Sequence, residues 1–256
     1  MIFAIDAGNT HIVLGCVEGD ALLFTARVHT DPTKTADEYA LAFRSLCDLH
    51  QIDRTKVEGA ILSCVVSELT GALCRAVEIV IHQKPLVVGA GIRTGLNIKI
   101  DNPAQLGADL VVGAVAALAK YRGPLVIFDM GTASTMSVID GKGQFLGGAI
   151  MAGLRLSVDG LSASTSQLPR IELDTPPKVI CSNTIQCMQA GAVYGHAAML
   201  DGLVDRVETE LGMPMASVIA TGGLARTVIP QCRRDITVDD SLMLDGLRII
   251  YEKNKA

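Results

Sequence analysis

The 256-residue sequence contains no tryptophan, and aromatic residues make up only 4% of it. This scarcity argues against a surface that binds nucleic acid by stacking bases on aromatic rings. The net charge is −5 and no cluster of lysine and arginine is present, so we expect neither nucleic acid nor a membrane as a partner. The longest apolar run, Leu110 to Ala119, is shorter than the roughly 20 residues that span a bilayer.

The seven cysteines are odd in number and include no Cys-x-x-Cys pair. This usage is typical of buried, reduced thiols and does not favour a zinc site. The N-terminus also lacks the basic and then apolar pattern of a signal peptide. We therefore expect a cytoplasmic protein.

Hydrophobic residues make up 49% of the chain and charged residues 19%, which indicates a large core and little disorder. Short apolar runs alternate with helical patterns, and this alternation predicts an α/β fold. The first three predicted strands are separated by glycine-containing turns and should form an antiparallel meander. The strands expected in the first half lie at residues 1–5, 11–19, 21–28, 59–66 and 85–89.

Helices are predicted where apolar residues recur at intervals of three and four. One is expected from 35 to 50, with Tyr39, Phe43 and Leu46 on one face. Others are expected at 68–81, at 106–120 and, as a long helix, at 184–211, whereas residues 164–169 should form an exposed loop.

The second half of the chain repeats the plan of the first. Residues 124–151 align with 1–28 almost without gaps, so that Asp129 matches Asp6 and Thr132 matches Asn9. We therefore expect two lobes, 1–115 and 120–256, with a cleft between them. Each lobe would present an Asp-x-Gly corner to that cleft.

The segment Asp6 to Thr10 has two interpretations. Asp, Gly and Asn are common in hairpin turns, so the segment can be an ordinary turn between strands. However, Asp6 directly follows an apolar strand, where a carboxylate is costly unless it is paired or binds a cation. A glycine-containing turn can also bring backbone N–H groups close to phosphate oxygens, and a carboxylate beside it can hold Mg²⁺ through water.

Two further segments have a structural and a functional interpretation. Residues 221–225, Thr-Gly-Gly-Leu-Ala, can be a simple connection from a strand to a helix or a close approach to the adenosine part of a nucleotide. Asp109 is the one charged residue between Asp101 and Lys120. It can compensate the dipole at the start of a helix, or it can accept a proton.

These segments together carry a resemblance. The Asp-x-Gly corners and the late Thr-Gly-Gly resemble the superfamily of acetate kinase, sugar kinases and actin. Within it, the chain resembles type III pantothenate kinases from end to end. The matching segments, in the order of that family, are "DAGNTH" (6–11), "DNPAQLGAD" (101–109), "FDMGTAST" (128–135), "GGAIMAG" (147–153), "NTIQCMQAG" (183–191) and "TGGLA" (221–225).

The resemblance implies a fold of duplicated ribonuclease H-like (actin-like ATPase) lobes, with mixed sheets flanked by helices and the nucleotide in the cleft between them. It implies transfer of the γ-phosphate of ATP to the primary hydroxyl of pantothenate, the first step toward coenzyme A. The residues it assigns to ATP are Asp6, Ala7, Gly8, Asn9, Thr10, His11, Ile12, Val13 and Thr132.

The same resemblance implies roles for ions and for the acceptor substrate. Asp6 would orient Mg²⁺ through water, and Asp129 would bind a monovalent cation, K⁺ or NH₄⁺. Asp109 would be the catalytic base, and a homodimer is expected. The residues it assigns to pantothenate are Gly107, Ala108, Asp109, Leu110 and Thr184, although Thr184 can also help Asn183 cap the following helix.

Two positions depart from the family pattern. Leu110 stands where the family usually has arginine, and Ile100 where many members have an aromatic residue. An arginine would pair naturally with the carboxylate of pantothenate, and Arg155 or Arg170 are candidates to replace it. The sequence therefore leaves two alternatives open: a kinase of the same fold for another small hydroxy acid or sugar, and a non-catalytic nucleotide-binding accessory protein.

Overall fold

The computed structural model describes residues 1–255, which form two compact units. The first unit contains Met1–Leu96, Asn102–Ala119 and the residues from Ser241 on. The second contains Asn97–Asp101 and Lys120–Asp240. Each unit is built around one mixed β-sheet.

The sheet of the first unit has the strand order β3-β2-β1-β4-β5. β1, β2 and β3 are antiparallel neighbours, as the meander prediction required, and β4 and β5 continue the sheet in parallel. Their bounds are Ile2–Ala7 (β1), His11–Glu18 (β2), Ala21–His29 (β3), Gly59–Cys64 (β4) and Leu86–Val87 (β5).

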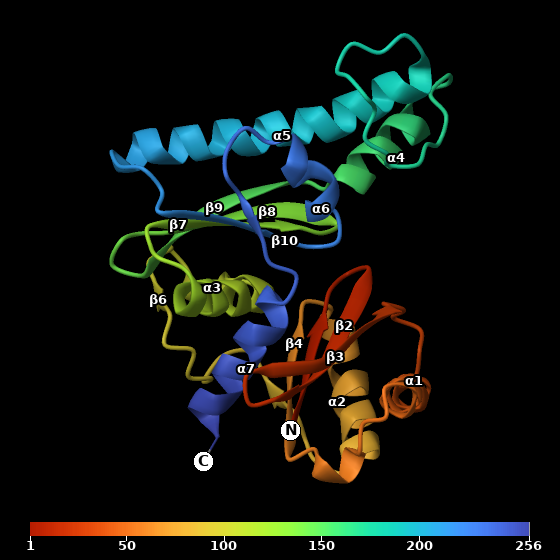
Figure 1. Ribbon diagram of the computed structural model, residues 1–256. Helices are drawn as coiled ribbons and strands as arrows, with labels where there is room; N and C mark the ends of the chain where they lie inside the picture. The colour runs from red at the N-terminus through yellow and green to blue at the C-terminus, as the bar shows by residue number, and fades with distance from the viewer. Residues whose placement is uncertain (256) are drawn as a thin grey trace. The chain divides into compact units, whose positions relative to one another are not determined.

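Helices cover both faces of this sheet (Figure 1). α1 and α2 share a core with one face, in which Phe3, Phe43 and Leu73 are completely buried. α7 packs against β1 and β4 on the opposite face. The helices of this unit are α1 (Ala36–Leu49), α2 (Ser67–Ile81), α3 (Ala108–Lys120) and α7 (Leu242–Asn254), with short 3₁₀ turns at Arg54–Lys56 and Pro103–Gln105.

Local sequence explains where α1 begins. The Thr35 side chain accepts a hydrogen bond from the Glu38 N–H, and the Glu38 carboxylate accepts one from the Thr35 N–H. This reciprocal pair satisfies two N–H groups that a helix start leaves unbonded. The apolar side chains of Tyr39, Phe43 and Cys47 then recur on the buried face.

The sheet of the second unit has the strand order β11-β10-β7-β8-β9-β6. β7, β8 and β9 form an antiparallel meander, and β10 pairs with β7 in parallel. The bounds are Asn97–Ile98 (β6), Leu125–Met130 (β7), Ala133–Ile139 (β8), Gln144–Ala152 (β9), Ser217–Thr221 (β10) and Thr237–Val238 (β11).

One long helix dominates the second unit. α5 runs from Thr184 to Leu211, the range predicted from the sequence, and lies along the sheet with α4 beside its N-terminal part (Figure 1). Phe128, Leu154 and Leu200 are central to the core between sheet and helices. The other helices are α4 (Leu154–Ser164) and α6 (Ala225–Val228), with a 3₁₀ turn at Ile229–Gln231.

The two sheets share one topology. The order β3-β2-β1-β4-β5 of the first corresponds to β9-β8-β7-β10-β11 of the second, with the same mixture of parallel and antiparallel pairs. This correspondence confirms the duplication expected from the sequence. The lobe boundaries at 115 and 120 stay a prediction, and the structure places α7, from the end of the chain, in the first unit.

Candidate active site

The first acidic corner is formed by the end of β1 and the turn into β2. Phe3, Ala4 and Ile5 are completely buried, whereas Asp6 is half-buried. The turn closes with a hydrogen bond from the Gly8 N–H to the His11 carbonyl, 3.0 Å long. The strand therefore carries a carboxylate out of the apolar core and directly into a polar turn.

Thr30, which follows β3, holds this turn in place. Its hydroxyl donates to the Gly8 carbonyl at 2.7 Å, and its N–H donates to the Thr10 carbonyl at 2.9 Å. The Thr30 side chain is itself buried. The sequence interpretation missed this residue, because nothing in the local pattern links Thr30 to a turn 20 residues earlier.

His11 begins β2 beside His29, with their ring centroids 6.2 Å apart in an edge-on arrangement. Partial burial lowers the pKa of His11, and the positive charges of Arg27 and His29 lower it further. His11 is therefore mostly uncharged at neutral pH. This state fits a packing or polar contact better than a positive charge held against phosphate.

The second acidic corner repeats the first on β7. β7 has the same succession of buried residues as β1, with Asp129 half-buried in the position of Asp6. Its turn closes with a hydrogen bond from the Gly131 N–H to the Ala133 carbonyl at 3.1 Å. Because Met130 pairs with Ser134 where Ala7 pairs with Ile12, this turn is one residue shorter than the first.

Thr132 lies within this shorter turn. The Gly153 N–H donates to its carbonyl at 3.2 Å, just as the Thr30 N–H donates to Thr10 in the first corner. A Cβ atom at Gly153 would collide with the carbonyl oxygens of Gly131 and Thr132. The second corner is thus supported by the close approach of the Gly153 backbone.

The Thr-Gly-Gly segment follows β10, which ends at Thr221. Gly222 has a φ of +97°, and a Cβ atom there would lie 2.7 Å from the backbone of Met130. The glycine is therefore required by the turn itself. The contact of this segment with adenosine stays a prediction.

Asp109 is the second residue of α3, and its carboxylate accepts the Leu110 N–H at 2.9 Å. Burial raises the pKa of Asp109 above its ordinary value, and the hydrogen bonds from the Leu110 and Asp109 amides only partly oppose this rise. A raised pKa makes the carboxylate a better proton acceptor. A Cβ atom at Gly107 would collide with the carboxylate, so this glycine leaves space for it.

Thr184 begins α5, but Asn183 caps the helix by accepting the Gln186 N–H at 2.9 Å. Thr184 instead lies in the wall of a largely apolar groove between α4 and α5, with a volume of about 350 Å³. Its other lining residues include Leu161, Met188 and His196. Thr184 therefore lies both at the start of the helix and in the wall of a groove, and its contact with a substrate stays a prediction.

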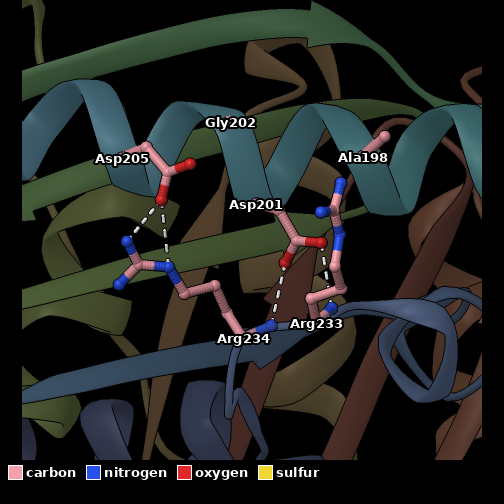
Figure 2. A pocket seen from close by; sticks show the side chains of 6 residues that line it. All are labelled: Ala198, Asp201, Gly202, Asp205, Arg233 and Arg234. Atoms are coloured by element: carbon pink, nitrogen blue, oxygen red, sulfur yellow. Dashed lines mark hydrogen bonds and ion pairs between the residues drawn. The ribbon is translucent and has the colours of Figure 1, made fainter.

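A second cavity, of about 330 Å³, lies beside α5 and contains none of the residues predicted for the site (Figure 2). Asp201 points from the helix toward the backbone of Arg233 and Arg234, and it accepts their N–H groups at 2.9 and 3.1 Å. Arg234 also forms an ion pair with Asp205. These contacts attach the segment after α6 to the helix.

Ion binding depends on the oxygen atoms that each corner offers. Within residues 1–255 no group of three or more His, Cys, Asp or Glu side chains is arranged to hold a metal. Mg²⁺ usually takes one or two carboxylates and completes its shell with water and phosphate oxygens. The Asp6 carboxylate, at the end of a strand and beside a polar turn, fits that requirement. Asp129 offers the same donor chemistry in the second unit.

Arg155 is one of the two arginines that the sequence offers as partners for the substrate carboxylate. Its guanidinium donates to the Ile171 carbonyl at 3.1 Å and lies 3.6 Å from the Glu172 carboxylate. It therefore already interacts with the segment that follows α4. Position 110 is leucine here, and the replacement of the family's arginine by Arg155 or Arg170 stays a prediction.

The predicted site residues fall in both units. Asp6 to Val13 and Gly107 to Leu110 belong to the first, and Asp129, Thr132 and Thr184 belong to the second.

No helix within residues 1–255 has both the length and the apolar character needed to cross a membrane.

Solved structures with low sequence identity share this fold. Component A of (R)-2-hydroxyglutaryl-CoA dehydratase from Acidaminococcus fermentans superposes with a TM-score of 0.57 at 13% identity, over 100% of both chains. A ROK hexokinase from Thermus thermophilus gives a TM-score of 0.54 at 13% identity, over 99% of both chains. The chain has the α/β fold with duplicated ribonuclease H-like sheets that defines the actin-like ATPases and sugar kinases.

Sequence comparison gives a more particular result. The family model described as "Type III pantothenate kinase" matches residues 2–206. A type III pantothenate kinase from Exiguobacterium sp. is 48% identical over 255 residues, which cover 100% of both chains. Another from Moorella thermoacetica is 43% identical over 254 residues, 99% of this chain and 100% of the relative. This chain therefore belongs to the type III pantothenate kinase family, and it is a kinase.

Proposed function

We propose that this protein transfers the γ-phosphate of ATP to pantothenate, giving 4′-phosphopantothenate in the first step of coenzyme A biosynthesis. The observation that carries the proposal is the identity of 42–48% to type III pantothenate kinases along the whole chain. Asp109 supports the proposal, because it is a half-buried carboxylate whose pKa is raised by burial and the chemistry needs a proton acceptor.

Asp109 is the proposed catalytic base. Its carboxylate accepts the proton of the primary hydroxyl of pantothenate as the new oxygen–phosphorus bond forms. The bond between the γ-phosphorus and the bridging oxygen breaks, and ADP leaves with that electron pair. Gly107, Ala108, Leu110 and Thr184 are the proposed contacts of the acceptor substrate.

ATP is assigned to the first corner, residues 6–13, and to Thr132 in the second. The Gly8 N–H closes the turn on the His11 carbonyl, so the backbone N–H groups proposed to bind phosphate are those of the residues after Gly8, and Thr30 fixes the shape of the turn. Asp6 is proposed to orient the water shell of Mg²⁺, and Asp129 to bind K⁺ or NH₄⁺. When bound, these ions offset the charge of the triphosphate.

We also propose a homodimer in the cytoplasm. Large apolar side chains are exposed on α4, on the segment after it and at the start of α5, among them Leu156 (52% exposed), Ile180 (86%) and Ile185 (50%). Exposed apolar surface of this kind favours contact with another protein surface, and a second copy is the proposed partner. The seven free cysteines fit a reducing compartment.

Leu110 favours one alternative, a kinase of the same fold for another small hydroxy acid or sugar. A coupled assay of ADP release over a panel of such acceptors, with and without K⁺, separates the two functions. We expect the highest kcat/KM with pantothenate, and a dependence on the monovalent cation. A preference for another acceptor would support the alternative, and ATP binding without turnover on any acceptor would support an accessory role.

A further inference from the structure

Ser63 lies on β4 directly beside Asp6. In the parallel pairing of β1 with β4, Asp6 is the register partner of Ser63. Side chains alternate between the two faces of a sheet, and register partners on neighbouring strands share a face. Ile5 and Leu62, one position earlier, both belong to the apolar core on the opposite face. Ser63 and Asp6 therefore project to the same side.

The hydroxyl group of Ser63 is completely buried. The residue is 0% exposed, and within residues 1–255 its Oγ has no hydrogen-bond partner. A buried hydroxyl without a partner destabilises a fold, and an alanine would fill nearly the same space without that cost. Ser134 also has a buried hydroxyl without a partner within residues 1–255, so burial alone does not assign a role, and what distinguishes Ser63 is its position as the register partner of the Asp6 carboxylate.

The internal repeat provides an independent observation. Thr221 is the register partner of Asp129 in the parallel pairing of β10 with β7, and it is also buried. Both sheets thus place a hydroxyl-bearing residue next to the acidic residue of the corner. Two positions earlier on β4 and β10, the residues on the same face of each sheet are Ile61 and Ile219, and both are apolar.

We propose that Ser63 is a positioning residue for Asp6. In the protein loaded with ATP and Mg²⁺, its Oγ–H donates to the Asp6 carboxylate and fixes the orientation in which that carboxylate faces the hydrated ion. The inference rests on the proposed function, because it takes from it the role of Asp6 toward Mg²⁺. It adds a residue that neither the sequence patterns nor the family resemblance singled out.

The experiment measures the affinity for ATP by titration calorimetry, with excess Mg²⁺ and again with EDTA. In the unchanged protein Mg²⁺ should strengthen ATP binding. We expect Ser63→Ala to reduce that strengthening roughly tenfold, the size of effect that losing a hydrogen bond to a charged group produces. Ser63→Thr, which introduces the residue type of the repeat, should keep it.

Ser134→Ala is the matched control. Ser134 is also buried (1% exposed) and its Oγ is also without a partner within residues 1–255, but it pairs with Met130 and faces the apolar core of the second unit. Its removal should leave the effect of Mg²⁺ unchanged. Thermal unfolding of each variant shows that it is folded, and Ser63→Cys replaces Ser63→Ala if the latter does not fold.

An effect of Mg²⁺ in Ser63→Ala within twofold of the unchanged protein would overturn the proposal, as would equal ATP affinity with and without Mg²⁺ in the unchanged protein. Pantothenate is absent from this titration, so the outcome does not depend on the acceptor substrate. If the unchanged protein fails to phosphorylate pantothenate but Ser63→Ala still loses the effect of Mg²⁺, the proposed function fails and the inference stands.

Discussion

The two acidic corners have the same strand order and the same pattern of burial, yet they are supported differently. The first has a longer turn, held by the Thr30 hydroxyl. The second is one residue shorter, and the backbone of Gly153 packs against it. The sheet and the carboxylate were kept on duplication, whereas the turn changed. The longer turn offers more N–H groups to phosphate, which fits the assignment of residues 6–13 to ATP. The second corner is proposed to contribute Thr132 to ATP and Asp129 to a monovalent cation.

Asp109 lies on α3, outside both corners. A substitution of Asp109 should therefore affect phosphate transfer without affecting the binding of ATP. We expect Asp109→Asn to lower kcat by about 10² or more, because the amide cannot accept the proton of the substrate hydroxyl. ATP affinity should change little. The measurement is steady-state turnover together with ATP titration. Activity equal to that of the unchanged protein would remove Asp109 from the mechanism.

Gly153→Ala tests the support of the second corner. The added methyl group would collide with the carbonyl oxygens of Gly131 and Thr132, so the turn must shift. We expect a loss of about 1–3 kcal/mol in the free energy of unfolding, the usual cost of overpacking, together with weaker ATP binding. Denaturant unfolding and ATP titration measure both effects.

Gly160→Ala, in the nearby helix α4, is the control for this variant. A Cβ atom at Gly160 meets no atom within 4 Å, so alanine should stabilise the helix by about 0.5–1 kcal/mol. If both glycine variants behaved alike, the close approach at Gly153 would have no energetic importance.

Thr30→Val tests the corresponding support of the first corner. Valine keeps the shape of threonine but removes the hydrogen bond to the Gly8 carbonyl. We expect a loss of about 1 kcal/mol in the free energy of unfolding and a severalfold weaker affinity for ATP. Thr30→Ser keeps the hydroxyl and should retain most of both. Unchanged ATP affinity in the valine variant would separate the turn from nucleotide binding.

The smallest expected effect is the contribution of the Asp109 carboxyl group to the pH dependence of the free energy of unfolding. Because burial raises its pKa in the folded chain, the folded state holds this proton more tightly than the unfolded state does. Its contribution to stability is therefore present below the unfolded pKa, about 4, and is lost as pH rises through the raised folded pKa. Asp109→Asn should unfold a few degrees higher than the unchanged protein at pH 7, and the difference should vanish near pH 4. A difference that is constant with pH would contradict the raised pKa.

Much of the fold could be predicted because its signals are local. The apolar runs predict the strands, and the spacing of apolar residues predicts the helix over 184–211. The alignment of the two halves of the chain predicts the repeated Asp-x-Gly segments. The structure confirms all three. The contact of Thr184 with a substrate, like the other assignments of site residues, stays a prediction.

The supports of the corners could not be predicted, because they depend on pairing between distant segments. Thr30 contacts a turn about 20 residues earlier, and Ser63 meets Asp6 only through strand register. The packing of α7 against the first sheet has the same origin, since the helix comes from the other end of the chain. Composition and periodicity contain no signal for such contacts.

The most direct test of the central claim is to identify the product. The purified protein is incubated with ATP, Mg²⁺, K⁺ and pantothenate, and phosphorus NMR and mass spectrometry then follow the γ-phosphate. The account predicts one phosphate ester on the primary hydroxyl of pantothenate, formed together with ADP and almost absent with Asp109→Asn. An unchanged protein that binds ATP but leaves pantothenate unphosphorylated would contradict it.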